Sequence, residues 1–205
     1  KVKTGWLSIE PPEPISGEYE DEVEWFYFSS QGKPKVGPRE GDANTGDLFK
    51  LNGRTYLFND KGNPVYGLQK LELAESGSYT AYYFGDKATS SVVKGKRKVE
   101  EDDGNVSEFY FADTGKGYNG VKDGYLYYMG KLQKAESGTK YQVITIDGKN
   151  YVVNTSGKLA KSTTVKNGDG VKYKTNGTGI LVKEDDEEPA SSYNEPSEPV
   201  WSSHY

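Results

Sequence analysis

The chain has 205 residues with 26 Lys+Arg, 31 Asp+Glu, one His and no Cys, and its formal net charge is −5 at pH 7. Without cysteine it has no disulfide, thiolate nucleophile or zinc–thiolate site. Its one histidine, His204, is the penultimate residue, where we expect nothing to hold it, so a Ser-His-Asp relay and a histidine metal site are excluded.

The composition predicts many short structural units and no single large core. Apolar residues make up 33% of the chain, below the usual share of about 45–50%. Tyr and Gly fill the gap, with 17 and 25 copies. Tyrosine buries area while its hydroxyl stays in water, and glycine supplies turns.

Residues 1–24 are predicted to be an N-terminal segment that includes an acidic, proline-containing linker. Residues 1–9 carry a charge of +2, whereas residues 10–24 hold seven acids and no base. The Pro-Pro-Glu-Pro stretch at 11–14 is typical of an extended loop.

Residues 25–183 contain an irregular repeat and carry a net charge of +7. Its pattern is an aromatic residue, an aromatic residue or valine two positions later, and a small residue at the seventh position. The second positions of successive copies are 30, 26, 27, 16, 26 and 20 residues apart. Clear copies begin at Phe26, Tyr56, Tyr82 and Phe109, weaker ones at Tyr151 and Val171, and a degenerate one at Tyr125.

Each copy is predicted to form a β-hairpin. Side chains two residues apart share one face of a strand, and Asn-Gly or Asp-Gly pairs, which suit two-residue hairpin turns, precede four copies at 52–53, 123–124, 147–148 and 169–170. Because a lone hairpin is unstable in water, neighbouring hairpins must stack. We therefore predict an all-β fold with little helix: a β-hairpin solenoid of tandem repeats of about 20–30 residues. Its expected core is Phe26, Phe28, Tyr56, Phe58, Tyr82, Phe84, Phe109 and Phe111.

Residues 184–205 are predicted to be an acidic, disordered tail. They contain seven acids and no base, with several Pro and Ser residues. Such a segment has too little apolar surface to offset the entropy cost of ordering.

The repeats resemble the bacterial cell-wall-binding repeats of the choline-binding and glucan-binding type. That pattern runs Trp-Tyr-Tyr-Phe, three residues, Gly, about four residues, and Gly-Trp. The matching stretches are Trp25-Phe-Tyr-Phe28 with Gly32 and Gly37, Tyr56-Leu-Phe58 with Gly62 and Gly67, Ala81-Tyr-Tyr-Phe84, and Glu108-Phe-Tyr-Phe111 with Gly115. The resemblance covers roughly residues 25–180 and implies a hairpin solenoid on the surface of, or secreted by, Gram-positive bacteria. It also implies attachment to choline-bearing teichoic acid or to glucan through cages of aromatic side chains.

Several positions depart from the family pattern. The leading Trp occurs only at Trp25, and the positions after the second glycine hold Pro38, Leu68, Lys96 and Val121; the sole Gly-Trp pair is Gly5-Trp6. We interpret the hairpin scaffold as retained and the row of choline cages as largely lost, which leaves the ligand open. The candidate ligand-binding residues are the outward aromatics Trp25, Tyr27, Tyr83 and Tyr110, together with Trp6 and Tyr128. The alternative role for each tyrosine is packing against a neighbouring strand.

The leading hypothesis is a non-catalytic, secreted or cell-surface module that binds cell-wall polymer, either teichoic acid or glycan, or another carbohydrate. No catalytic residue, metal ligand, cofactor or membrane span is predicted, and nucleic acid is not an expected partner at a sequence pI near 5.1. The basic run Lys94-Gly-Lys-Arg-Lys98 could grip phosphates, but the acids at 100–103 favour a hairpin with self-paired charges. Two alternatives stay open: a structural spacer or host-facing adhesin, and the targeting end of a lytic enzyme or toxin. Homodimer formation also stays open.

Overall fold

The computed structural model describes residues 1–11, 19–74 and 76–205, so residues 12–18 of the predicted linker lie outside the described residues. The chain forms two compact units. The first unit comprises residues 1–94, 101–103 and 200–205, and the second comprises 95–100 and 104–199.

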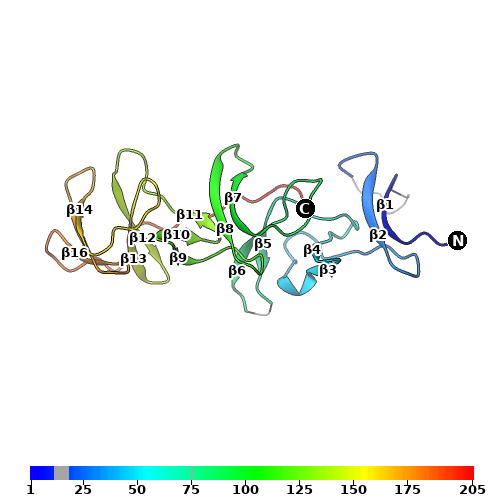
Figure 1. The fold of residues 1–205 in the computed structure, drawn as a ribbon, viewed down its shortest axis with the longest axis horizontal. Helices are drawn as coiled ribbons and strands as arrows, with labels where there is room; N and C mark the ends of the chain where they lie inside the picture. The colour runs from blue at the N-terminus through cyan, green and yellow to red at the C-terminus, as the bar shows by residue number, and fades with distance from the viewer. Residues whose placement is uncertain (12–18, 75) are drawn as a thin grey trace. The chain divides into compact units, whose positions relative to one another are not determined.

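The first unit contains three two-stranded antiparallel hairpins. The only helical element among the described residues is a three-residue 3₁₀ turn, η1 (Thr45–Asp47). The hairpins are β1 (Gly5–Ile9) with β2 (Glu24–Phe28), β3 (Phe49–Leu51) with β4 (Arg54–Tyr56), and β5 (Leu68–Glu72) with β6 (Tyr79–Tyr83) (Figure 1).

The second unit contains three antiparallel sheets. A five-stranded sheet has the order β7-β8-β11-β10-β9 and is built from β7 (Gly95–Glu100), β8 (Val106–Phe111), β9 (Gly120–Lys122), β10 (Tyr125–Tyr128) and β11 (Lys131–Leu132). It is followed by the hairpin of β12 (Tyr141–Ile146) and β13 (Lys149–Asn154), and by the sheet of β14 (Thr164–Lys166), β15 (Lys172–Thr175) and β16 (Leu181–Glu184).

Within each unit, a hairpin bonds to the hairpin that follows it in the sequence. The amide of Gly37, after β2, donates to the carbonyl of Asn59, after β4, at 2.8 Å. In the second unit, the amide of Val152 on β13 donates to the carbonyl of Gly179, just before β16, at 3.0 Å. The prediction of an all-β array of stacked hairpins is therefore confirmed.

Three of the four predicted turns have the expected backbone. Both residues of the pairs at 52–53, 123–124 and 147–148 have positive φ. The fourth pair differs, because only Gly170 has positive φ. There the side chain of Asn167 accepts hydrogen bonds from the amides of Asp169 and Val171, at 2.9 and 3.0 Å, and shapes the turn locally.

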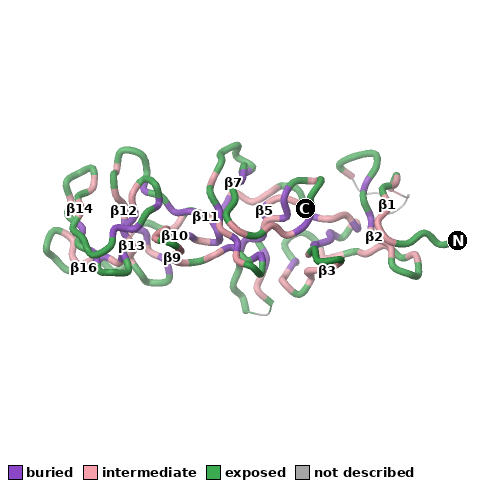
Figure 2. The backbone as a smooth tube through the Cα atoms, viewed as in Figure 1, coloured by how far each residue is buried: buried purple, intermediate pink, exposed green. Residues whose placement is uncertain are grey.

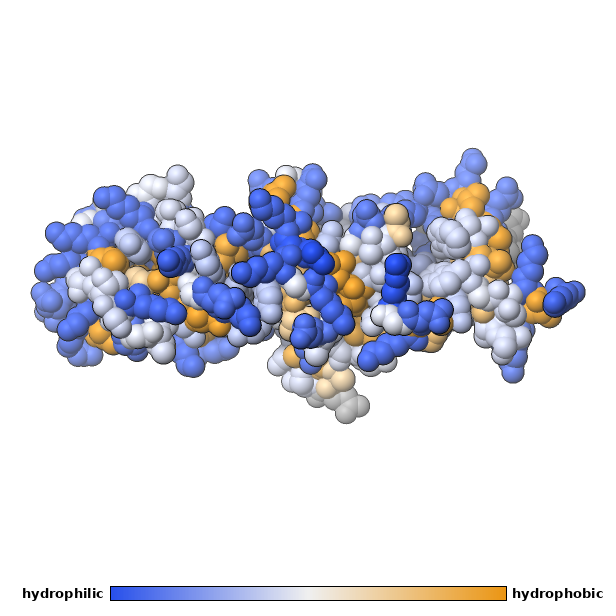
Figure 3. All heavy atoms as spheres, viewed as in Figure 1, coloured by the Kyte–Doolittle hydropathy of each residue, from blue (hydrophilic) through white to orange (hydrophobic). Residues whose placement is uncertain are grey.

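The core is divided into small clusters, as the composition predicts (Figure 2). One cluster in the first unit joins Leu57, Leu71 and Phe84, and one in the second unit joins Leu126, Ile144 and Val153, with their neighbours. On the face drawn in Figure 3, hydrophobic residues form small patches among hydrophilic ones. Seven of the eight predicted core aromatics are buried, and Phe28 is half-buried.

The acidic tail differs from the predicted disorder, because it hydrogen-bonds along both units. In the second unit, Asn194 forms a parallel bridge with Ile144 on β12, and the amide of Ser197 donates to the side chain of buried Gln133 at 2.7 Å. In the first unit, the amide of Ser202 donates to the carbonyl of Leu68 at 2.9 Å. The prediction of disorder counted only the apolar side chains of the tail. The tail is held instead by hydrogen bonds to strand edges and side-chain amides, whose polar groups need partners.

His204, which we expected to be unheld, is also fixed in the structure. Its ring stacks on Tyr66, with centroids 4.6 Å apart, and its Nδ1 lies 3.0 Å from a carboxylate oxygen of Glu20. Among the described residues, no helix has the length and apolar composition needed to cross a membrane. Those residues also contain no group of three or more His, Cys, Asp or Glu side chains arranged to hold a metal ion.

Candidate functional site: an aromatic cleft in the first unit

The first hairpin presents three large aromatic side chains on one face. In the β1–β2 register, Trp6 pairs with Tyr27 and Ser8 pairs with Trp25, so Trp6, Tyr27 and Trp25 share that face. The ring of Trp6 lies 5.4 Å from that of Tyr27 and 6.4 Å from that of Trp25, both edge-on. The structure thus brings together three of the six predicted ligand-binding residues.

The second hairpin completes this aromatic group. The ring of Tyr56 on β4 lies 5.1 Å from Trp6, and Phe58 stacks on Trp6 at 5.8 Å with an interplanar angle of 23°. The side-chain amide of Asn63 donates to the backbone carbonyl of Trp25 at 3.1 Å and ties the two hairpins together. Contacts from both hairpins therefore fix the positions of these aromatic rings.

A cleft of about 350 Å³ opens beside these rings, and we call it the aromatic cleft. Trp25 is 51% exposed, so much of this large apolar ring meets solvent at the cleft. The lining consists of Trp6, Glu24, Trp25, Arg54, Tyr56, Asn63, Pro64 and residues 87–90. An exposed aromatic face beside amide, hydroxyl and guanidinium groups suits a ligand that has both apolar and hydroxylated faces, such as a sugar ring.

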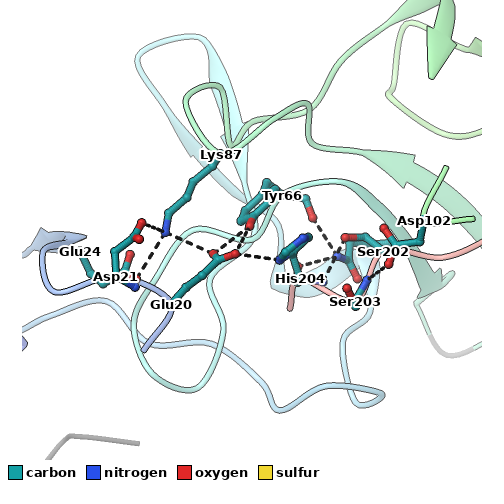
Figure 4. Close-up of polar contacts among 10 residues, drawn as sticks. Glu20, Asp21, Glu24, Tyr66, Lys87, Asp102, Ser202, Ser203 and His204 are labelled. Atoms are coloured by element: carbon teal, nitrogen blue, oxygen red, sulfur yellow. Dashed lines mark hydrogen bonds and ion pairs between the residues drawn. The ribbon is translucent and has the colours of Figure 1, made fainter. Parts of the chain in front are cut away.

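Glu24 and Lys87, which line the cleft, belong to an ion-pair network that Figure 4 shows. The ammonium of Lys87 lies 2.6 Å from a carboxylate oxygen of Asp21, 3.2 Å from Glu20 and 3.4 Å from Glu24. Glu24 is only 5% exposed, and its carboxylate also accepts from the amide of Asp21 at 2.9 Å. Lys87 thus provides the nearby positive charge that a buried carboxylate needs.

The same contacts shift the pKa of several groups in this network. Burial by itself would lower the pKa of Lys87, but the hydrogen bonds to Asp21 and Glu20 outweigh it and raise that pKa. Burial would raise the pKa of Glu20, but hydrogen bonds from Tyr66 and Lys87 lower it. Burial and then the hydrogen bond to Glu20 raise the pKa of Tyr66.

Replacing Lys87 is expected to weaken the first unit at neutral pH. In Lys87→Met, buried Glu24 loses its cation, and the free energy of unfolding should fall by about 1–2 kcal/mol. Because the pKa of Glu20 lies below its ordinary value of 4.5 in the folded state, its contribution is present above that pH and is lost as the pH falls through the lowered pKa. In denaturant titrations across this pH range, the free energy of unfolding should therefore fall less steeply with decreasing pH for Lys87→Met than for the native chain.

The matched control for this measurement is Lys50→Met, which removes an exposed lysine of β3. Its free energy of unfolding should stay within about 0.5 kcal/mol of that of the native chain. An equal loss in both variants would show that Lys87 acts only through net charge.

Of the six predicted residues only Trp6 and Trp25 line the aromatic cleft; Tyr27 packs behind them against Trp6 and Phe49, and the other three lie elsewhere. Tyr83 is a half-buried residue at the end of β6, where burial and then the Asp86 carboxylate raise its pKa. Tyr110 packs edge-on against Tyr118 at 5.3 Å. Tyr128 packs against the core cluster that contains Leu126, and burial raises its pKa. These contacts are the ones expected if each of the three tyrosines has a packing role, which was the alternative stated for it.

Sequence reasoning missed most of the residues that line this cleft. Tyr56 was predicted to be core; it is 8% exposed, yet its ring touches Trp6 and lines the cleft. Arg54, Glu24 and Lys87 were not singled out. The signal for Glu24 is its place directly before Trp25 on β2, two residues from buried Phe26 and therefore on the same face. The sequence carries no signal that Lys87 pairs with it, because the two residues are 63 positions apart.

Comparisons with known proteins identify solved structures that have a similar fold. No family model matches the sequence, and no curated protein matches it. The chain is similar to a crystal structure of CbpF in complex with ipratropium, with 24% identity, a TM-score of 0.54, and coverage of 88% of this chain and 49% of that one. It is also similar to crystal form II of choline binding protein F from Streptococcus pneumoniae, with 24% identity, a TM-score of 0.53, and coverage of 89% and 49%. The likeness shows that the chain has the hairpin-repeat fold of these structures, and the chain spans about half of their length.

Proposed function

We propose that this chain is a non-catalytic module that binds bacterial cell-wall polymer or carbohydrate, and that the aromatic cleft is its binding site. The observation that carries the proposal is the exposed Trp25 ring at a cleft walled by Trp6 and Tyr56. The fold shared with choline binding protein F supports the wall-binding assignment. A secreted or surface-associated location follows from the same proposal.

A glycan fits this cleft better than a quaternary ammonium does. Cation–π binding of such a group needs ring faces and a neutral or negative surround. Lys87 is neutralised by its carboxylate partners, but the guanidinium of Arg54 also lines the cleft and would repel a second cation. Asn63, Thr89 and Ser90 offer hydrogen-bonding groups. We therefore propose that a sugar ring stacks on Trp25 while its hydroxyls bond to the polar lining.

The test is retention of the chain on purified Gram-positive cell walls. On walls stripped of teichoic acid the native chain should be retained, and Trp25→Ala/Tyr27→Ala should bind about thirtyfold more weakly or worse, since aromatic anchors that become buried on binding contribute about 2 kcal/mol or more. The matched control is Tyr79→Ala, which removes a tyrosine of the same unit that is 44% exposed and does not line the cleft. Circular dichroism and thermal melting check that each variant is folded.

The competitor and the wall preparation identify the ligand. Oligosaccharides released from the wall glycan should compete with binding, and free choline should not. Walls stripped of teichoic acid should still retain the chain. Failure of the native chain to bind either preparation would overturn the proposal, and competition by choline would replace the sugar with a quaternary ammonium.

A second candidate function is a structural spacer or adhesin, and the packing of Tyr83, Tyr110 and Tyr128 favours it. In that case retention would be equal for the native chain and for Trp25→Ala/Tyr27→Ala. Because the chain spans about half of the solved structures it matches, a role as the targeting end of a larger lytic enzyme or toxin also belongs among the proposals.

A further inference from the structure

The second unit contains a groove of about 620 Å³, which we call the basic groove. Its lining consists of Lys96, Arg97, Lys98, Glu108, Phe109, Tyr125, Tyr127, Lys134, Thr155 and Ser156. Four cations and one carboxylate give this lining a net charge of +3. The net charge of the groove is therefore opposite in sign to that of the whole chain, which is −5.

Several strands of the unit build the groove. Three consecutive cations lie on β7, and Arg97 is paired with Phe109 on β8. Tyr127 comes from β10, and Lys134 follows β11. Phe109 and Tyr127 are buried, at 1% and 5% exposure, and form an apolar support beneath the charges. Paired strands thus position the cations, which sit on a regular sheet.

The cations of the groove outnumber its one carboxylate, that of Glu108, which lies opposite Lys98 in the β7–β8 register. Within the part of the chain that the structure describes, Lys96, Arg97, Lys98 and Lys134 form no ion pair with a carboxylate. Two of the acids predicted to pair with this run accept backbone hydrogen bonds from the C-terminal residues: the carboxylate of Glu101 accepts from the amide of Val200, and that of Asp102 accepts from the amide of Ser203 at 2.8 Å. Holding like charges around one groove is unfavourable, and a bound anion removes that cost.

We infer that the basic groove binds a linear polymer of phosphate diesters that carries no nucleobases. Lysine and arginine are the groups that bind phosphate oxygens most strongly. The hydroxyl groups of Thr155 and Ser156, both exposed, supply hydrogen bonds for the linkers between phosphates. A neutral glycan would leave the net charge of +3 in the groove unbalanced, so this ligand differs from the sugar proposed for the aromatic cleft.

Single-stranded nucleic acid fits the groove less well. Proteins that bind it stack its bases on exposed aromatic faces. Two of the three aromatic rings in the groove, those of Phe109 and Tyr127, are buried and offer no such face. The groove therefore favours a polyanion that is recognised through its phosphates alone.

The test is calorimetric titration of the full chain with unsubstituted poly(glycerol phosphate). Binding should weaken as salt is raised, because phosphate contacts release counterions. Lys96→Gln/Arg97→Gln/Lys134→Gln should weaken binding about tenfold or more, since each charge-assisted contact is stronger than a neutral one. The matched control, Lys161→Gln/Lys166→Gln/Lys174→Gln, removes three exposed lysines of the same unit that do not line the groove. It should bind within about twofold of the native chain.

Three outcomes would overturn the inference. They are no binding at low salt, equal weakening in the two triple variants, and binding of an oligothymidylate as tight as that of poly(glycerol phosphate). Trp25→Ala/Tyr27→Ala separates this inference from the proposed function, because it should lose glycan retention and keep its affinity for poly(glycerol phosphate). The two measurements can therefore disprove one binding site while the other still binds its ligand.

Discussion

Trp6→Ala is expected to abolish retention on walls stripped of teichoic acid and to destabilise the first unit by about 2–3 kcal/mol, less than the cost for a fully buried ring because Trp6 is half-buried. The indole of Trp6 touches four rings: it lies 5.1 Å from Tyr56, 5.4 Å from Tyr27, 5.8 Å from Phe58 and 6.4 Å from Trp25. Its removal leaves a void between the first two hairpins, and the aromatic cleft loses the ring that lies beside Trp25. Chemical denaturation and wall retention measure the two effects separately.

Trp201→Ala is the matched control for this variant. Trp201 also belongs to the first unit, but it does not line the aromatic cleft, and its ring lies 6.0 Å from the ammonium of Lys70. Retention should be unchanged in this control. The conservative variant Trp6→Phe should keep most of the stability and only part of the binding. If Trp6→Ala binds walls as the native chain does, Trp6 has a packing role alone.

Gly37→Ala is expected to destabilise the first unit by about 3 kcal/mol or more, at the upper end of the cost of overpacking. A Cβ atom on Gly37 would lie 1.8 Å from the carbonyl oxygen of Phe58 and 2.7 Å from its carbonyl carbon. Both atoms are backbone, so rotation of a side chain cannot relieve the clash. The hydrogen bond from Gly37 to Asn59, which joins the first two hairpins, would be lost with it.

Gly177→Ala in the second unit is the control for a glycine without such a contact. The φ of Gly177 is not positive, and the nearest atom to its added Cβ is the hydroxyl of Ser162 at 3.5 Å, an ordinary contact. Its free energy of unfolding should change by less than about 1 kcal/mol. Thermal or denaturant unfolding of the two variants, side by side, measures the difference; equal effects would contradict the close-approach explanation for Gly37.

The repeated features of the fold could be predicted from the sequence because they depend on neighbouring residues. The alternation of aromatics placed Phe26 and Phe84 in the core, where the structure has them. At the second glycine of the first repeat, Gly37, the backbone lies in close contact with the backbone of Phe58. Trp25 and Tyr27 could be chosen as candidates because they occupy the outward positions of the repeat that the chain resembles, and the structure places Trp6 on the same face.

The remaining features depend on contacts between distant residues. Tyr56 obeys the core pattern, but its ring reaches the neighbouring hairpin and lines the cleft. Lys87 meets Glu20 from 67 positions away, and Asn194 pairs with Ile144 from far along the chain. Composition predicted disorder for the tail because it counts apolar area, and it does not count the backbone donors of an unpaired strand edge.

The assignment of residues 200–205 to the first unit has a mechanical consequence. Both chain ends belong to that unit, so a force applied between Lys1 and Tyr205 acts first on the first unit. Residues 104–199 cannot be extended until the C-terminal residues detach, which requires breaking the bonds from Ser202 to Leu68 and from Tyr205 to Pro38. Stretching this chain by its ends should therefore show release of the C-terminal residues before the second unit lengthens.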